Sequence, residues 1–130
     1  MATYSTFEEL KVWQTSRILN KDLFQLFMDK DDRKFGFLIN HIFKTAGSVM
    51  DNIAEGHGRQ GTKEFILFLS YSTGSADELR SQLYRAMDLE IISIPDFEKM
   101  RKQCIDIVAQ LNYFSNYLKQ CEHRGNKFKR

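Results

Sequence analysis

The stretch GHGRQG, residues 56–61, contains glycines in the pattern G-x-G-x-x-G, which is typical of dinucleotide-binding sites. Asp77 follows at about twenty residues, the distance at which such a site places an acidic residue. In that chemistry, the glycines let the backbone approach a pyrophosphate at the start of a helix. The pattern works only between a strand and the helix that follows it, so the flanking elements decide whether this chemistry is available.

Residues around the same glycines could also support acid–base or metal chemistry. His57 lies close in sequence to Glu55 and Glu64, and Arg59 could stabilise an anion. Metal sites in helical bundles usually contain Glu-x-x-His pairs, however, and none of the three histidines has a Glu three residues before it. The chain also lacks G-x-S-x-G, Walker and Cys-x-x-Cys motifs. We therefore predict no catalytic residue, no metal and no cofactor.

The composition is typical of one soluble globular domain. The chain has 130 residues, of which 42% are hydrophobic and 28% are charged, and a chain of this length can form a core without disulfides. No segment approaches the roughly eighteen uncharged apolar residues of a membrane span, and the N-terminus lacks a signal-peptide pattern. We therefore expect a cytoplasmic protein with no membrane partner. Cys104 and Cys121 are expected to be reduced thiols in the core.

Apolar residues recur at spacings of three and four along most of the chain, which predicts amphipathic helices. The only proline is Pro95, and no segment has the alternating pattern of a strand. The predicted helices are 7–28, 35–55, 63–91 and 95–121. Short loops favour an all-α, antiparallel up-down-up-down four-helix bundle over residues 1–121, followed by a basic flexible tail, 122–130. The glycines then lie between two helices and Asp77 lies within one, which excludes the dinucleotide site.

Polar residues before three of these helices predict where the helices start. Thr6 and Glu9 form a T-x-x-E capping box. Thr62 is a candidate N-cap for the third helix. Ser93 is a candidate N-cap for the fourth helix, and Pro95 falls in its first turn, where the missing N–H is tolerated.

The glycines themselves have a structural interpretation. Gly56 is expected to close the second helix in a left-handed conformation, and Gly58 and Gly61 allow a tight reversal of the chain. Gly74 lies within the third helix, where it costs about 1 kcal/mol relative to Ala. Close approach of another helix would compensate, and the small residues TGSA, 73–76, could pack against a helix of the same chain or of a neighbouring subunit.

Residue identities around the glycines resemble those of the bacterial four helix bundle protein family, over roughly residues 7–120. The family includes proteins encoded within intervening sequences of large-subunit ribosomal RNA genes. The resemblance implies the same bundle and a homopentamer. A related protein, the accessory variability protein of diversity-generating retroelements, binds nucleic acid and a reverse transcriptase. The motif residues, whose role is either structural or functional, are Asn52, Glu55, Gly56, Gly58, Arg59, Lys63, Glu64, Gly74 and Ser75.

Positive charge is concentrated at the C-terminal end of the chain. The net charge is only +2, but residues 99–130 contain eight Lys/Arg and two Asp/Glu. Such asymmetry indicates a nucleic-acid partner, RNA or DNA, although the same residues could simply solvate the exposed face of the last helix. The candidate nucleic-acid-binding residues are Lys99, Arg101, Lys102, Lys119, Arg124, Lys127, Lys129 and Arg130.

These observations favour a non-catalytic, homo-oligomeric and pentameric accessory protein that associates with RNA or DNA through its basic surface. A nucleic-acid-processing protein is a further expected partner. The alternative is a structural scaffold that binds a protein partner and has no affinity for nucleic acid, for which we expect an exposed apolar groove or rim.

Overall fold

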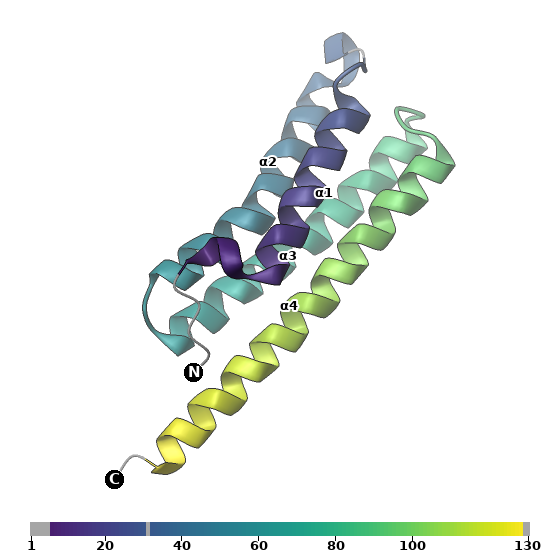
Figure 1. Cartoon of the computed structure of the whole chain (residues 1–130). Helices are drawn as coiled ribbons and strands as arrows, with labels where there is room; N and C mark the ends of the chain where they lie inside the picture. Colours follow the sequence, from purple (N-terminus) through teal and green to yellow (C-terminus); the bar gives the residue numbers. More distant parts are fainter. Residues whose placement is uncertain (1–5, 31, 129–130) are drawn as a thin grey trace.

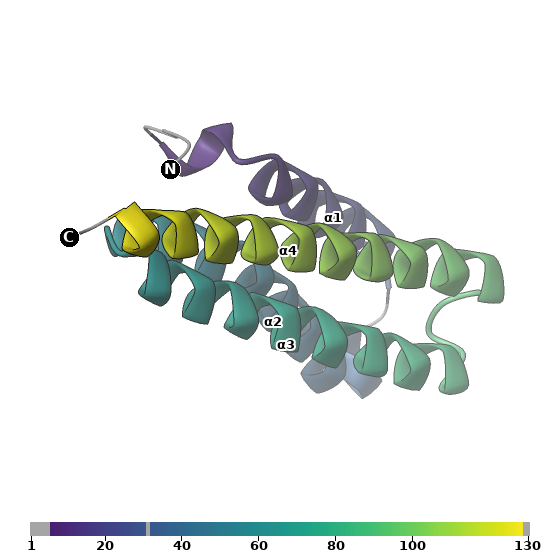
Figure 2. The same cartoon turned by 90° about the horizontal axis from the view of Figure 1, so that it is seen from below.

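A computed structural model describes residues 6–30 and 32–128, with side chains described for 6–30 and 33–125. The elements in chain order are η1 (Phe7–Glu9), α1 (Lys11–Phe27), α2 (Asp32–Gly58), α3 (Thr62–Asp88) and α4 (Ile94–Phe128). The helices alternate in direction, and α1 packs against α2 and α4 while α3 packs against the same two helices (Figures 1 and 2). The fold is therefore the predicted all-α, up-down-up-down four-helix bundle.

The first predicted helix, 7–28, is divided in the structure. Phe7–Glu9 forms a short 3-10 helix, Leu10 is extended with φ −73° and ψ 122°, and α1 begins at the next residue. The break lets Leu10 enter the core with 2% of its surface exposed and brings the Phe7 ring to 5.0 Å from the Trp13 ring. Thr6 does occupy the N-cap position of the 3-10 helix, but its hydroxyl makes no capping hydrogen bond, so the predicted capping box is wrong.

The glycine loop also differs from the prediction. Gly56 is helical rather than left-handed, because α2 continues to Gly58, and no described glycine has a positive φ. The left-handed turn residue is Gln60, with φ 64°. The N-cap of α3 is Gly61, in an extended conformation, and Thr62 is the first residue of that helix rather than its cap.

The start of α4 agrees with the sequence prediction, whereas its end does not. The Asp96 backbone N–H donates to the Ser93 hydroxyl at 3.2 Å, and Pro95 lies in the first turn. The helix continues past the predicted end at 121 to Phe128, because the segment contains no proline and its one glycine, Gly125, costs only about 1 kcal/mol. Lys129 and Arg130 lie outside the described residues.

The four helices differ greatly in length. Helix α1 has 17 residues, α2 and α3 have 27 each, and α4 has 35. At a rise of about 1.5 Å per residue, α4 is about 12 Å longer than α3. Because α3 and α4 are joined by a short turn, this difference places the last turns of α4 beyond the start of α3, as Figure 1 shows.

The core consists of the apolar stripes that the sequence predicts. Completely buried side chains come from every long helix and include Leu19, Leu23, Ile42, Val49, Ile53, Leu79, Leu83, Ile107 and Leu111. Both cysteines are free thiols; Cys104 is buried in this core, whereas Cys121 is only half-buried. Among the described residues, no helix combines the length and the apolar character that a membrane span requires.

Helices α2 and α3 approach each other closely at Gly56. A Cβ atom built at Gly56 would lie 2.7 Å from the Phe68 Cβ and 3.0 Å from the Phe65 Cδ1. The Phe68 Cβ is attached directly to the backbone and cannot move aside, so only glycine permits this spacing. The reason for a glycine here is therefore close packing of two helices and not the left-handed conformation predicted above.

We predict that Gly56→Ala lowers the free energy of unfolding by about 1–3 kcal/mol, the usual cost of overpacking, although alanine is the better helix former. Gly47→Ala is the matched control. Gly47 lies in the same helix and a Cβ there would meet nothing within 4 Å, so this substitution should stabilise the protein slightly. Urea denaturation at one fixed protein concentration measures both effects. Equal stability of the two variants would contradict the packing explanation.

The burial of the Cys104 thiol leads to a second prediction. Burial raises the pKa of Cys104 from 9.0 to about 12, with Arg80 lowering it and Asp77 raising it to smaller extents. Below pH 9.0 the thiol is protonated in both the folded and the unfolded chain, so its full contribution to the free energy of unfolding is present. Above that pH the unfolded chain releases the thiol proton while the folded chain keeps it, so stability falls as the pH rises toward about 12.

Replacement of Cys104 with alanine should therefore flatten the decline of unfolding free energy above pH 9.0, by up to about 1.4 kcal/mol per pH unit. The decline is measured by urea denaturation across alkaline pH, with Cys121→Ala as the control. An unchanged decline in Cys104→Ala would rule out this thiol as its source.

Candidate functional site

Side chains at the glycine loop form contacts between the end of α2 and the start of α3. Arg59 forms an ion pair with Glu55 at 2.8 Å, one turn earlier in the chain. The Arg59 guanidinium carbon also lies 4.9 Å from the centre of the Phe68 ring of α3. On the same side, the His57 ring lies edge-on to Phe65 at 6.1 Å. Both members of the ion pair are about half exposed, so the pair contributes only modestly to stability.

The structure does not bring these described residues together as a set of metal ligands. In the part of the chain that the structure describes, no three His, Cys, Asp or Glu side chains are placed to hold a metal ion. Glu64 is exposed in the first turn of α3, and Lys63 is exposed beside it. Asp77 forms an ion pair with Arg80 at 3.5 Å within α3. Residues 6–30 and 32–128 contain no strand, so the glycine pattern lacks the element that a dinucleotide site needs.

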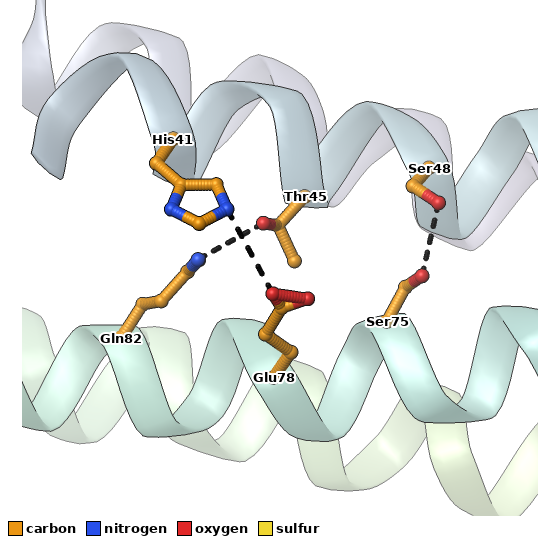
Figure 3. Close-up of polar contacts among 6 residues, drawn as sticks. All are labelled: His41, Thr45, Ser48, Ser75, Glu78 and Gln82. Atoms are coloured by element: carbon orange, nitrogen blue, oxygen red, sulfur yellow. Dashed lines mark hydrogen bonds and ion pairs between the residues drawn. The ribbon is translucent and has the colours of Figure 1, made fainter. Parts of the chain in front are cut away.

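A line of polar contacts, here called the α2–α3 polar seam, runs between the two central helices (Figure 3). The Gln82 amide donates to the Thr45 hydroxyl at 3.0 Å, the Ser48 and Ser75 hydroxyls lie 2.9 Å apart, and His41 lies 3.8 Å from Glu78. Gln82 and Thr45 are buried, whereas the other four side chains reach the surface to different extents. The seam therefore crosses from the core to the outside of the bundle.

Further hydrogen bonds join the seam to the backbone of α2. Asn52 donates to the Ser48 carbonyl at 2.9 Å and to the Ser48 hydroxyl at 3.0 Å. The buried Ser72 hydroxyl donates to the Val49 carbonyl at 2.6 Å. Ser75, one of the motif residues, thus connects α3 directly to α2, whereas the hydrogen bonds of Asn52, another motif residue, stay within α2.

Gly74 lies beside the seam but does not pack against another helix of the chain. It is exposed, and a Cβ built there would meet nothing within 4 Å. Close approach within the chain is therefore the wrong explanation for this glycine, and contact with a neighbouring subunit stays a prediction. Leu67 and Tyr71 precede Gly74 by seven and three residues, which places them on the same side of α3, and 46% and 49% of their surfaces are exposed.

The first group of basic residues lies near the start of α4 among acidic neighbours. Lys99 and Lys102 are exposed, and the half-buried Arg101 donates through Nε to the Tyr84 hydroxyl at 3.1 Å. Lys99 shares a shallow depression with Asp22 of α1. The three cations of residues 94–106 are balanced by three acids, Asp96, Glu98 and Asp106. This end of α4 therefore has little net charge.

The described members of the second group lie toward the C-terminal end of α4. Lys119 and Arg124 are exposed, the Lys127 backbone continues the helix, and Lys129 and Arg130 fall outside the described residues. Residues 107–130 contain these five cations and one acid, Glu122. Lys102 and Lys119 are separated by about 25 Å along the helix, at about 1.5 Å per residue. One chain therefore does not bring the eight predicted residues together.

Sequence reasoning missed two tyrosines on the same half of α4. Tyr113 is 80% exposed, the largest value among the exposed large hydrophobic side chains, and Tyr117 is 38% exposed. Tyr113 adjoins a pocket of about 400 Å³ between the start of α1 and α4. The available signal was the position of Tyr113, which lies off the buried stripe formed by Leu111 and Leu118.

Comparisons with known proteins agree with this fold. No curated protein matches the chain. A solved structure of a protein of unknown function from the S23 ribosomal protein family of Bacteroides thetaiotaomicron VPI-5482 is 19% identical and superposes with a TM-score of 0.72. The alignment covers 80% of this chain and 97% of that chain. At this level of identity, the similarity shows the shared fold alone.

The family assignment comes from the sequence. The family model described as 23S rRNA-intervening sequence protein matches residues 8–113, which include most of η1, all of α1, α2 and α3, and α4 as far as residue 113. The match contains the glycine loop and the motif residues on which the resemblance was based. The chain belongs to the 23S rRNA-intervening sequence protein family.

Proposed function

We propose that this protein is a non-catalytic, cytoplasmic accessory protein that assembles as a homo-oligomer and binds RNA or DNA through α4. The observation that carries the proposal is the C-terminal half of α4, where Lys119 and Arg124 are exposed. In the sequence, cations outnumber acids by five to one over residues 107–130. A phosphate backbone can reach this end because the last turns lie beyond the start of α3 (Figure 1).

Oligomerisation would strengthen such binding. Each cation that neutralises a phosphate releases condensed counterions, and a ring of identical subunits multiplies the number of contacts. Lys119 and Arg124 lie beyond the family match, which ends at 113. The basic end of α4 is therefore a feature of this chain outside the segment that matches the family model.

The exposed side of α3 is the surface that we propose for contact between subunits. Leu67, Tyr71 and Gly74 follow one another at spacings of four and three, so they form one stripe on the helix. An uncovered glycine within a helix has no benefit inside one chain, whereas it lets a second helix approach closely. We propose a pentamer, the assembly that the family resemblance implies.

A protein-binding scaffold is the second candidate function. The observation in its favour is the presence of exposed apolar side chains on α1 and at its C-cap, where Ile18, Phe24 and Met28 are 58%, 56% and 66% exposed. An apolar surface of this kind fits a protein partner, such as a nucleic-acid-processing protein, better than a phosphate backbone. The scaffold function predicts that nucleic acid does not bind even at low salt.

Titration of the purified protein with labelled structured RNA and duplex DNA at several salt concentrations tests the proposed function. We predict that the double variant Lys119→Gln/Arg124→Gln binds more weakly and that its log–log salt slope falls by about 1.8 for duplex DNA, or about 0.9 per lost phosphate contact. Light scattering on the same samples checks that assembly is unchanged.

The matched control is Lys99→Gln/Lys102→Gln, which removes the same charge from the end of α4 where acids balance the cations. We expect a smaller loss of affinity and a smaller change of slope in this variant. Equal effects would place the main contacts along the whole helix, and no effect of either variant would remove α4 from the interface.

Gly74→Arg tests the subunit contact. We predict that the arginine side chain separates the α3 stripes of two subunits, so that light scattering detects a smaller assembly while circular dichroism still shows a helical protein. Gly74→Ala adds a single methyl group to an open position and should retain the assembly. An unchanged mass for Gly74→Arg would exclude this stripe from the interface.

A further inference from the structure

The pocket beside Tyr113, here called the α1–α4 pocket, combines features that suit a flat heteroaromatic ligand. Its volume is about 400 Å³, within the range of small-molecule sites. Its walls come from two segments: Leu10, Lys11 and Val12 at the start of α1, and Ala109, Gln110, Tyr113 and Phe114 of α4. The walls are mainly apolar, and Lys11 is the only charged residue among the described residues that line the pocket.

Gln110, which lines the pocket, carries a buried hydrogen-bond acceptor without a partner among the described residues. Its Oε1 atom is buried and accepts no hydrogen bond from any group in the described part of the chain. An unsatisfied buried acceptor is unfavourable unless a donor is supplied from elsewhere. The terminal torsion of a glutamine is soft, so the amide can turn toward a donor that enters the pocket.

Aromatic and charged side chains surround this acceptor. Tyr113 adjoins the pocket with 80% of its surface exposed, so that one face of the ring is free to stack. Lys11 is exposed at the pocket. Tyr117, Gln120 and Arg124 continue from Tyr113 at spacings of four, three and four, which places them on the same side of α4.

We infer that the α1–α4 pocket binds an unpaired base of a single-stranded nucleic acid. The base stacks on Tyr113, an N–H of the base donates to Gln110, and Lys11 and Arg124 contact phosphates. This inference rests on the proposed function and deepens it, because it selects single strands over duplexes. A base within a duplex has both of its faces stacked and cannot enter the pocket, whereas stacking on aromatic side chains is the usual mode of single-strand binding.

The apolar walls alone would also accept a peptide side chain. The unpartnered acceptor, the exposed ring and the nearby cations together match a nucleotide better, because a nucleotide offers a donor, a flat face and a phosphate. A free nucleoside monophosphate has the same chemistry, so the experiment must separate it from a strand.

The test uses fluorescence anisotropy of the full chain with a short labelled oligothymidylate, whose bases are unpaired and carry an N3–H donor. Tyr113→Ala should weaken binding roughly 5- to 150-fold, the range for stacking of one base, whereas Tyr113→Phe, which keeps the ring, should bind nearly normally. Phe37→Ala is the matched control, because Phe37 is a 68% exposed aromatic residue of α2 that does not line the pocket.

Gln110→Leu separates binding from folding. Leucine keeps the approximate volume but removes the unsatisfied oxygen, so the free protein should be at least as stable in urea denaturation while its affinity for oligothymidylate falls at least fivefold. A purely structural role of Gln110 would lower stability instead and leave the affinity unchanged.

Two competitors identify the ligand. An abasic oligonucleotide of the same length carries the same phosphates and should compete poorly, and thymidine monophosphate should compete only at far higher concentration than the oligothymidylate. Tight competition by the monophosphate would overturn the strand in favour of a free nucleotide. Binding that is insensitive to both Tyr113→Ala and Gln110→Leu, or equal affinity for the matching duplex, would overturn the pocket assignment while leaving the proposed function intact. Failure of every nucleic acid to bind would overturn both.

Discussion

The close contact of α2 with α3 at Gly56 is the constraint on which the positions of the other candidate residues depend. A Cβ here would lie 2.7 Å from the Phe68 Cβ and 3.0 Å from Phe65, so the two helices are held at a spacing that only glycine allows. Phe65 in turn lies edge-on to Phe114 at 5.4 Å, and Phe114 is stacked with Tyr117 at 6.4 Å. Phe114 also lines the α1–α4 pocket. A continuous row of aromatic contacts therefore connects the glycine loop to the pocket.

The α2–α3 polar seam fixes the register of the two helices, which the apolar contact at Gly56 cannot do. Apolar side chains attract one another without strong directional preference, whereas the Gln82–Thr45 and Ser48–Ser75 hydrogen bonds form at one relative position of the helices. The cost is visible at Gln82, because its Oε1 has no partner among the described residues. A sliding movement of α3 along α2 would break the whole seam and leave further buried groups unsatisfied.

Prediction from the sequence succeeded at the start of α4, whereas the caps predicted at Thr6 and Thr62 and the roles predicted for two glycines were wrong. The Ser93 cap and Pro95 are local, and both were placed correctly. Gly56 was assigned to a helix end because a left-handed cap and a close packing contact require the same residue. Only the position of Phe68 on the next helix distinguishes them. The prediction that Gly74 packs against a helix of the same chain was wrong for the converse reason, since no other helix of the chain approaches it.

The candidate site was also predicted only in part from the sequence. Residue types and charge identified the cations of α4, but their separation into a balanced group and an unbalanced group depends on where each lies along the helix. The pocket was not predictable, because it requires both the break at Leu10 and the exposure of Tyr113. Hydrophobic periodicity predicts an amphipathic helix but does not predict where one helix extends beyond the helices that pack against it.

The unequal lengths of the helices connect the fold to the proposed function. Helix α4 is about 12 Å longer than α3, so its last turns extend past α3, and Arg124 is exposed there. Because α1 has 17 residues and α4 has 35, that end of α4 needs no partner within the chain. It can carry unbalanced positive charge that a helix in the centre of a bundle could not. The same mismatch leaves Tyr113 exposed beside the start of α1, so base stacking and phosphate binding would both follow from a short first helix packed against a long last one.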